Sequence, residues 1–100
     1  MTEDNSPNVR LAFIWASENI ATANPAAFQN RIEVFASLLD DCDSRVRIET
    51  PEIFRVIGKR LPEIVAPYIN KLRQLAENDP ERVVRIHALG AIKAMESQRK

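Results

Sequence analysis

Three arginines recur along the chain, and each follows an aspartate by six residues. The pairs are Asp4 with Arg10, Asp41 with Arg47, and Asp79 with Arg85. A planar guanidinium suits two uses: a structural ion pair with a carboxylate, or a row of arginines that binds phosphate or carboxylate ligands. The acids recur in step with the arginines, so we favour structural pairing over ligand binding.

The remaining reactive side chains do not form a catalytic or metal-binding set. His87 is the only histidine, and neither an acid nor a nucleophile near it in sequence supports general-base catalysis, so we expect it on the surface. Cys42 is the only cysteine, which leaves no disulfide framework or thiolate cluster, and we expect a solvent-side thiol. Asp40, Asp41 and Asp43 lack the spacing and the glycine of a calcium loop. We therefore expect no enzyme, no metal and no cofactor.

Composition indicates one soluble domain of 1–100. Hydrophobic residues make up 45% of the 100 residues and charged residues 28%, which is ordinary for a globular protein. Formal net charge is zero, so no broad attraction to nucleic acid or to an anionic membrane is expected. The longest apolar run, residues 11–16, is too short to span a bilayer. The acidic start of the chain is unlike a secretory signal, and we predict a cytoplasmic location.

Prolines and polar caps mark where helices begin. Ser6-Pro7, Asn24-Pro25 and Asp79-Pro80 each offer a capping oxygen followed by a proline that suits the first turn. Pro62 starts another helix without a cap, and either Asp43 or Ser44 caps the remaining one. The predicted helices span 7–22, 25–40, 44–59, 62–77 and 80–97. Short linkers between them favour antiparallel hairpins.

A shift of 37 or 38 residues superposes the apolar positions of these helices. Positions recurring at steps of three and four predict one buried stripe on each helix. In the first helices the aligned sets are Val9, Val46 and Val84; Ala16, Ile53 and Ala91; Ile20, Ile57 and Met95. In the second helices the pairs are Phe28 with Val65, Ile32 with Ile69, Phe35 with Leu72, and Leu38 with Leu75.

The repeated pattern, clearest over residues 79–92, resembles the first helix of HEAT repeats. The second copy departs from it at Thr50-Pro51, and the first has Phe13 in place of a small residue. The resemblance implies an all-α fold: a short right-handed α-α superhelix of about five antiparallel helices, with repeats at 4–40 and 41–78 and a half repeat at 79–97. Armadillo repeats are a close alternative. The first helices would form the convex face and the second helices the concave one.

The resemblance also implies roles for individual residues. Arg10, Arg47 and Arg85 would form a ladder between repeats, with Asp41 and Asp79 as their partners. Solenoids of this kind bind a protein or peptide segment on the concave face. The candidate residues there are Lys71, Gln74 and Asn78 on one helical face, with Asn70 and Arg73 beside them, and Val34, Ser37 and Arg31 at or near the matching positions of the other helix.

Two alternative functions stay open. Some HEAT-like proteins bind nucleic acid through basic concave faces, but Lys71 and Arg73 are few for that purpose. A HEAT-like subunit associated with an enzyme, such as a lyase, would bind a small molecule, and no residue set supports one.

The two ends of the chain raise further questions. Trp15 is either a binding anchor or a cover for the first end of the stack. At the other end, Ile86, Leu89, Ile92 and Met95 have only one neighbouring helix to cover them. We expect this end to dock onto another subunit or onto further repeats, unless the helix tilts inward and closes the core itself.

Overall fold

The computed structural model describes residues 6–97, which are helical and contain no strand. The elements are α1 (Pro7–Ala23), the 3-10 helix η1 (Pro25–Phe28), α2 (Ile32–Leu38), α3 (Ser44–Arg60), α4 (Pro62–Val65), the 3-10 helix η2 (Ala66–Tyr68), α5 (Ile69–Asn78) and α6 (Arg82–Ser97). The predicted all-helical class is therefore correct for the described part of the chain.

Two of the predicted helix caps are present. The Ser6 hydroxyl accepts a hydrogen bond from the Val9 amide at 3.3 Å, with Pro7 in the first turn of α1. Asp43, rather than Ser44, caps α3, because its carboxylate accepts the Arg45 amide at 2.8 Å. The predicted cap at Asn24 is wrong, since its side chain makes no capping bond.

The predicted start of the last helix at residue 80 is also wrong, because α6 begins at Arg82. Asp79 Oδ1 accepts the amide of Glu81, two residues on, at 2.9 Å, and Oδ2 accepts from Arg47 at 2.8 Å. The carboxylate therefore holds the turn before the helix and reaches across to α3. The Glu81 carbonyl accepts the Arg85 amide at 3.2 Å and so stands at the start of the helical bonding pattern.

The sequence predicts continuous second helices over 25–40 and 62–77, but in the structure both are interrupted. The first is divided into η1 and α2, and the second into α4, η2 and α5. Pro67 lies inside the second break, where its missing N–H removes a bond of the α-helical ladder. Pro51, by contrast, is buried inside the unbroken α3.

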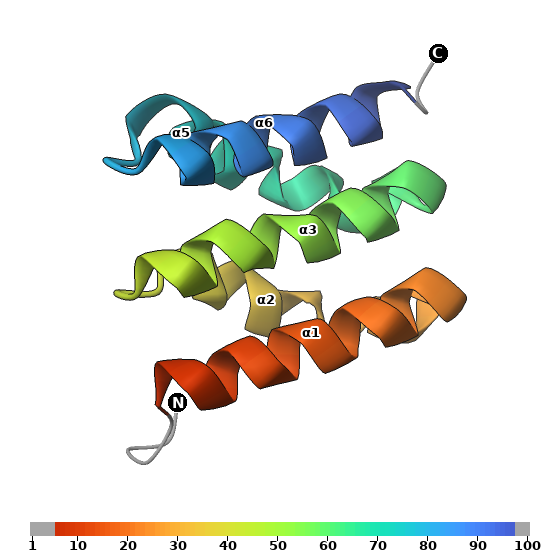
Figure 1. The fold of residues 1–100 in the computed structure, drawn as a ribbon. Coiled ribbons are helices and arrows are strands. Elements are labelled where there is room, and N and C mark those ends of the chain that lie inside the picture. Colours follow the sequence, from red (N-terminus) through yellow and green to blue (C-terminus); the bar gives the residue numbers. More distant parts are fainter. Residues whose placement is uncertain (1–5, 98–100) are drawn as a thin grey trace.

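We call α1, α3 and α6, the first helix of each predicted repeat, first-type helices, and α2 and α5 second-type helices. The first-type helices lie side by side, with α2 and α5 behind them (Figure 1). In this layer α3 lies between α1 and α6 and packs against both. Helix α6 also packs on α5. Successive first-type helices therefore stack in one direction along the molecule.

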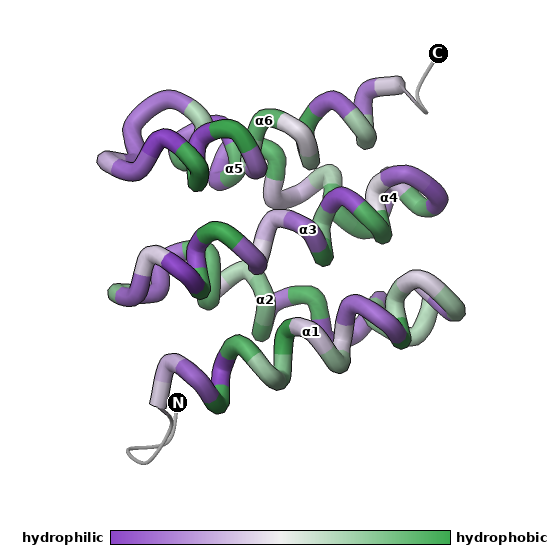
Figure 2. Tube along the Cα trace, viewed as in Figure 1, coloured by the Kyte–Doolittle hydropathy of each residue, from purple (hydrophilic) through white to green (hydrophobic). Residues whose placement is uncertain are grey.

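The core lies between the two layers and between neighbouring first-type helices (Figure 2). Phe35, Leu39, Phe54 and Leu72 are among its large, fully buried members. Tyr68 makes an edge-to-face contact with Phe54, with ring centroids 5.8 Å apart.

The predicted buried stripe of α1 is wrong. Val9, Ala16 and Ile20 are exposed, although their counterparts in α3 and α6 are buried. The buried positions of α1 are instead Arg10, Leu11, Ile14, Ser17 and Ala21. Among the described helices, α1 has a first-type neighbour only on its α3 side (Figure 1), and the stripe of Val9, Ala16 and Ile20 is uncovered. Ile69 of the second-type stripe is only partly buried against the core.

Candidate functional site

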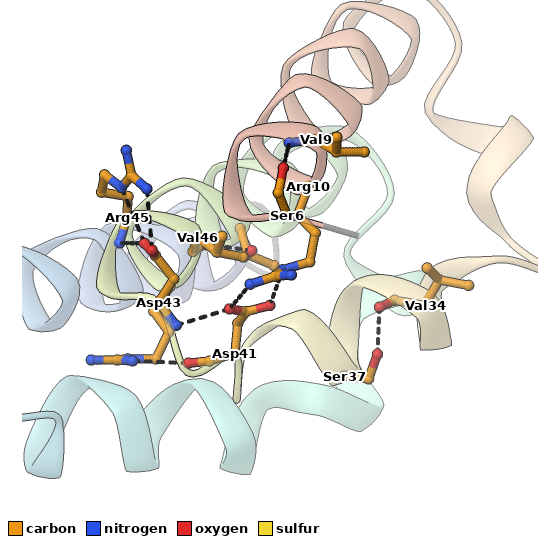
Figure 3. A network of polar contacts seen from close by, with 11 residues as sticks. Ser6, Val9, Arg10, Val34, Ser37, Asp41, Asp43, Arg45 and Val46 are labelled. Atoms are coloured by element: carbon orange, nitrogen blue, oxygen red, sulfur yellow. Dashed lines mark hydrogen bonds and ion pairs between the residues drawn. The ribbon is translucent and has the colours of Figure 1, made fainter. Parts of the chain in front are cut away.

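The recurring arginines and aspartates form ion pairs between successive first-type helices. Arg10 Nε lies 2.6 Å from Asp41 Oδ2, and Arg10 Nη2 donates to Oδ1 at 2.9 Å, a two-pronged pair shown in Figure 3. Both side chains are almost fully buried, at 6% and 5% exposure. Arg47 pairs with Asp79 through a single contact, from Nε to Oδ2, at 2.8 Å. Asp41 and Arg10 therefore fix how the turn before α3 sits on α1, and Asp79 and Arg47 do the same for α6 on α3.

Each arginine also ties down the turn before its own helix, where that turn is described. Arg47 Nη1 donates to the Asp41 carbonyl at 2.8 Å, and Arg85 Nη1 donates to the Asp79 carbonyl at 2.6 Å. Within residues 6–97, Arg85 differs from Arg10 and Arg47 in having no carboxylate partner. The first acid of the sequence pattern, Asp4, lies outside the described residues.

The residues predicted for a concave binding face fall into two separate groups. Lys71 forms an ion pair with Asp40, and Arg73 lies 3.5 Å from Glu96 of α6, so both cations of this face are paired. Asn70, Gln74 and Asn78 are exposed on α5.

Arg31 and Ser37 lie elsewhere, beside α1. Arg31 lines one hollow between α1 and α2, and Ser37 lines another while its hydroxyl donates to the Val34 carbonyl at 2.8 Å. Neither hollow is lined by Lys71, Gln74 or Asn78, but the partner of Lys71, Asp40, lines the same hollow as Ser37. The two groups therefore meet at Asp40, and only Arg31 and Ser37 of the predicted residues line a hollow.

The two hollows adjoin each other, and we name the surface that contains them the N-terminal groove: the part of α1 and α2 with Phe13, Ile20 and Val34. The hollows have volumes of about 550 and 390 Å³, and Phe13 and Val34 line both of them. These three apolar side chains are exposed by between 46% for Phe13 and 55% for Ile20. Phe13 is held in place by stacking on Phe35 at a centroid distance of 5.4 Å. The groove is thus preformed, apolar and open to solvent.

A second apolar surface lies at the other end of the stack, on α6. Val83, Ile86 and Leu89 are exposed there, and we name them the C-terminal face. Ile92 and Met95 of the same helix are buried. The helix therefore closes the core with one side and leaves the other side exposed. Docking of this end onto another subunit or onto further repeats stays a prediction.

Polar contacts on the outer side of the first-type helices include one that the sequence did not predict. His87 Nδ1 lies 2.8 Å from Glu52 Oε2, so an acid does stand beside the histidine, contributed by α3 rather than by its own helix. His87 is half-buried by this contact rather than fully outward. Trp15 is half exposed, and its indole N–H donates to Glu49 at 3.3 Å.

Acidic residues gather next to this contact. Burial, followed by the charges of Glu52 and Glu49, raises the pKa of Glu18 above its ordinary value. Even so, no group of three or more histidine, cysteine, aspartate or glutamate side chains in residues 6–97 is placed to hold a metal ion. Cys42 is exposed, as predicted, and it lines the larger hollow.

Sequence reasoning missed the N-terminal groove because it treated Val9, Ile20 and their counterparts as equally buried. The available signal was position: within residues 6–97, α1 has no first-type helix before it to cover this stripe. No described helix combines the length and the apolar character needed to cross a membrane. No family model matches the chain, and neither a search of curated proteins nor a search of solved structures finds a match.

Proposed function

We propose that the chain is a non-enzymatic, HEAT-like α-solenoid module that binds a helical segment of a protein partner in its N-terminal groove. The observation that carries this proposal is the pair of adjoining hollows on either side of Phe13 and Val34. Large apolar side chains left half exposed in a contiguous patch are typical of a surface that binds another protein.

The shape of the groove favours a helix over an extended peptide. A groove between two helices accepts the apolar stripe of an amphipathic helix, whose side chains recur at steps of three, four and seven. Two hollows that share the Phe13–Val34 ridge offer places for two successive side chains of such a stripe. An extended strand would need unpaired backbone groups along the rim, which an all-helical surface does not supply.

The alternatives have less support. Lys71 and Arg73, the cations that would attract nucleic acid to the second helices, are already paired with Asp40 and Glu96. Binding of a peptide by the polar face of Lys71, Gln74 and Asn78 is the competing location for the same function.

Binding of a labelled amphipathic helical peptide, with leucines spaced to form one stripe, tests the proposal by fluorescence anisotropy. We expect saturable binding that changes little with salt, because the contact is apolar. Val34→Glu places a charge between the two hollows and should abolish binding, whereas Gln74→Glu, on the exposed face of α5, should leave it intact.

The reverse pattern, with binding lost in Gln74→Glu and kept in Val34→Glu, would assign the function to the polar face of α5. Absence of saturable binding to the wild-type protein would refute the proposed function altogether. Circular dichroism of both variants checks that each one is folded; Val34 is 51% exposed, so its replacement should be tolerated.

A further inference from the structure

The internal packing of the chain indicates what could cover its two ends. Val46, Ile53 and Ile57 of α3 are all fully buried, and α3 packs against α1. The residues at the same repeat positions in α1 are Val9, Ala16 and Ile20. Val9 is 54% exposed and Ile20 is 55% exposed. The exposed stripe of α1 therefore occupies the same repeat positions as a stripe that is fully buried in α3.

The C-terminal face corresponds to the other side of the contact between α1 and α3. Leu11 and Ile14 of α1 are buried on the side that α3 covers. At the same repeat positions, α3 has Ile48, which is partly buried, and Pro51, which is buried. Helix α6 has Ile86 and Leu89 there, exposed by 54% and 44%, and no helix among residues 6–97 covers them.

The charged ladder indicates the same direction of stacking. Arg10 and Arg47 each bind an aspartate in the turn before the next first-type helix. Arg85 holds the equivalent place in α6 but has no carboxylate among residues 6–97. In the sequence, the aspartate that precedes the first of these helices is Asp4, which lies outside the described residues.

We propose that a second copy of this chain stacks end to end on the first, with the C-terminal face of one copy (Val83, Ile86 and Leu89) packed on the α1 side of the N-terminal groove of the other. This inference names the partner of the groove and so rests on the proposed function. Helices α6 and α1 of the two copies run parallel, as α1, α3 and α6 do within one copy (Figure 1).

Two properties of the assembly follow from this geometry. The contact joins two different surfaces, so it leaves both ends of a pair open and allows chains of more than two copies. A single pair of helices buries less than the ~1,200 Å² of a stable interface, so association is weak and needs a high protein concentration.

Sedimentation velocity of the wild-type protein over a wide concentration range is the first test. We expect the weight-average mass to rise past that of a dimer. Ile20→Glu disables the N-terminal groove and Ile86→Glu disables the C-terminal face; both positions are more than half exposed, so both variants should fold. Each variant alone should be monomeric, because every contact needs one intact surface of each kind.

An equimolar mixture of the two variants distinguishes this arrangement from a symmetric dimer. The mixture should contain a heterodimer, since Ile20→Glu keeps a C-terminal face and Ile86→Glu keeps a groove. Self-association of Ile86→Glu alone, with no complex in the mixture, would mean that two grooves pair with each other and would overturn the proposal. Trp15→Gln, an exposed apolar position on neither surface, should associate like the wild type.

Substitution of Arg85 tests whether its charge contributes to the contact between two copies. Arg85→Gln should weaken self-association about tenfold, as expected for a charge-assisted hydrogen bond. Arg82→Gln, one turn earlier on the same helix and exposed, should change it less than about twofold. Equal effects of the two substitutions would contradict a role of Arg85 in the contact.

The outcomes also separate this inference from the proposed function. A wild-type protein that stays monomeric at high concentration, yet binds the helical peptide in its groove, overturns the stacking and leaves the function standing. A protein that neither associates nor binds the peptide overturns both.

Discussion

Removal of the Asp79 carboxylate should be among the most damaging single changes in this protein. The side chain is 3% exposed and Arg47, its partner at 2.8 Å, is 15% exposed. Asp79→Ala leaves the guanidinium without a carboxylate in a nearly dry site, and it removes the acceptor of the Glu81 amide as well. Stranding one member of a buried pair costs about 3–5 kcal/mol.

That cost is large against the stability of about 5–15 kcal/mol that a domain of this kind has. With a urea m value of about 2 kcal/mol per M, the midpoint of unfolding should fall by about 2 M. Chemical denaturation followed by circular dichroism measures this shift. Asp79→Asn should lie between the wild type and Asp79→Ala, because the amide oxygen still accepts the Glu81 amide but carries no charge.

Glu96→Ala is the matched control, because it breaks the pair with Arg73, in which both side chains are about half exposed. Exposed pairs contribute about 0–1 kcal/mol, so the midpoint should barely move. The double substitution Arg47→Met with Asp79→Leu adds a second check. It should restore much of the stability lost in Asp79→Ala, since no charge is then left buried. Equal destabilisation by Asp79→Ala and Glu96→Ala would refute the reasoning that burial sets the cost.

Three further predictions use positions whose surroundings differ in one respect. Gly58→Ala should destabilise the protein, because an added Cβ would lie 3.0 Å from Val65 Cγ2 and 3.4 Å from Met95 Cβ. An added Cβ at Gly90 meets nothing within 4 Å, so Gly90→Ala should stabilise α6 by about 0.5–1 kcal/mol. Thermal melts of both variants check these two predictions. Ile57→Ala should lower the free energy of unfolding by about 2–5 kcal/mol. Ile20→Ala, at the same repeat position but exposed, should lower it by less than about 0.5 kcal/mol. Similar decreases in chemical denaturation would show that the two sites are packed alike. The pKa of Glu18 is raised in the folded state above the ordinary 4.5, so the folded protein binds this proton more tightly than the unfolded chain does. The free energy of unfolding should therefore fall as pH rises through the window just above 4.5. Glu18→Gln should flatten that part of the stability–pH curve, and an unchanged curve would contradict the assignment.

Much of the fold could be predicted from local signals. The Ser6-Pro7 and Asp43 caps mark the starts of α1 and α3, because a side-chain oxygen and a fixed backbone angle act within one turn. The pairing of Arg10 with Asp41 and of Arg47 with Asp79 follows a recurrence that is visible in the sequence.

The features that were missed depend on neighbours in space. The sequence predicts Asp79 as a cap for the last helix, but its carboxylate accepts from Arg47 of α3, and α6 begins at Arg82. Glu52 lies beside His87 although 35 residues separate them in the chain. Val9 and Ile20 carry the same pattern as buried residues, and only their place at the end of the layer leaves them exposed.

The position of α3 between α1 and α6 has a consequence for local opening (Figure 1). Amide protons exchange with solvent when a helix detaches or frays, and the outer members of a stack can do so without disturbing the rest. Exposure of α3 requires that one flank be peeled away first. Its amides should therefore be the last to take up deuterium, and the slowest of them should lie near Ile53 and Phe54, deepest in the core.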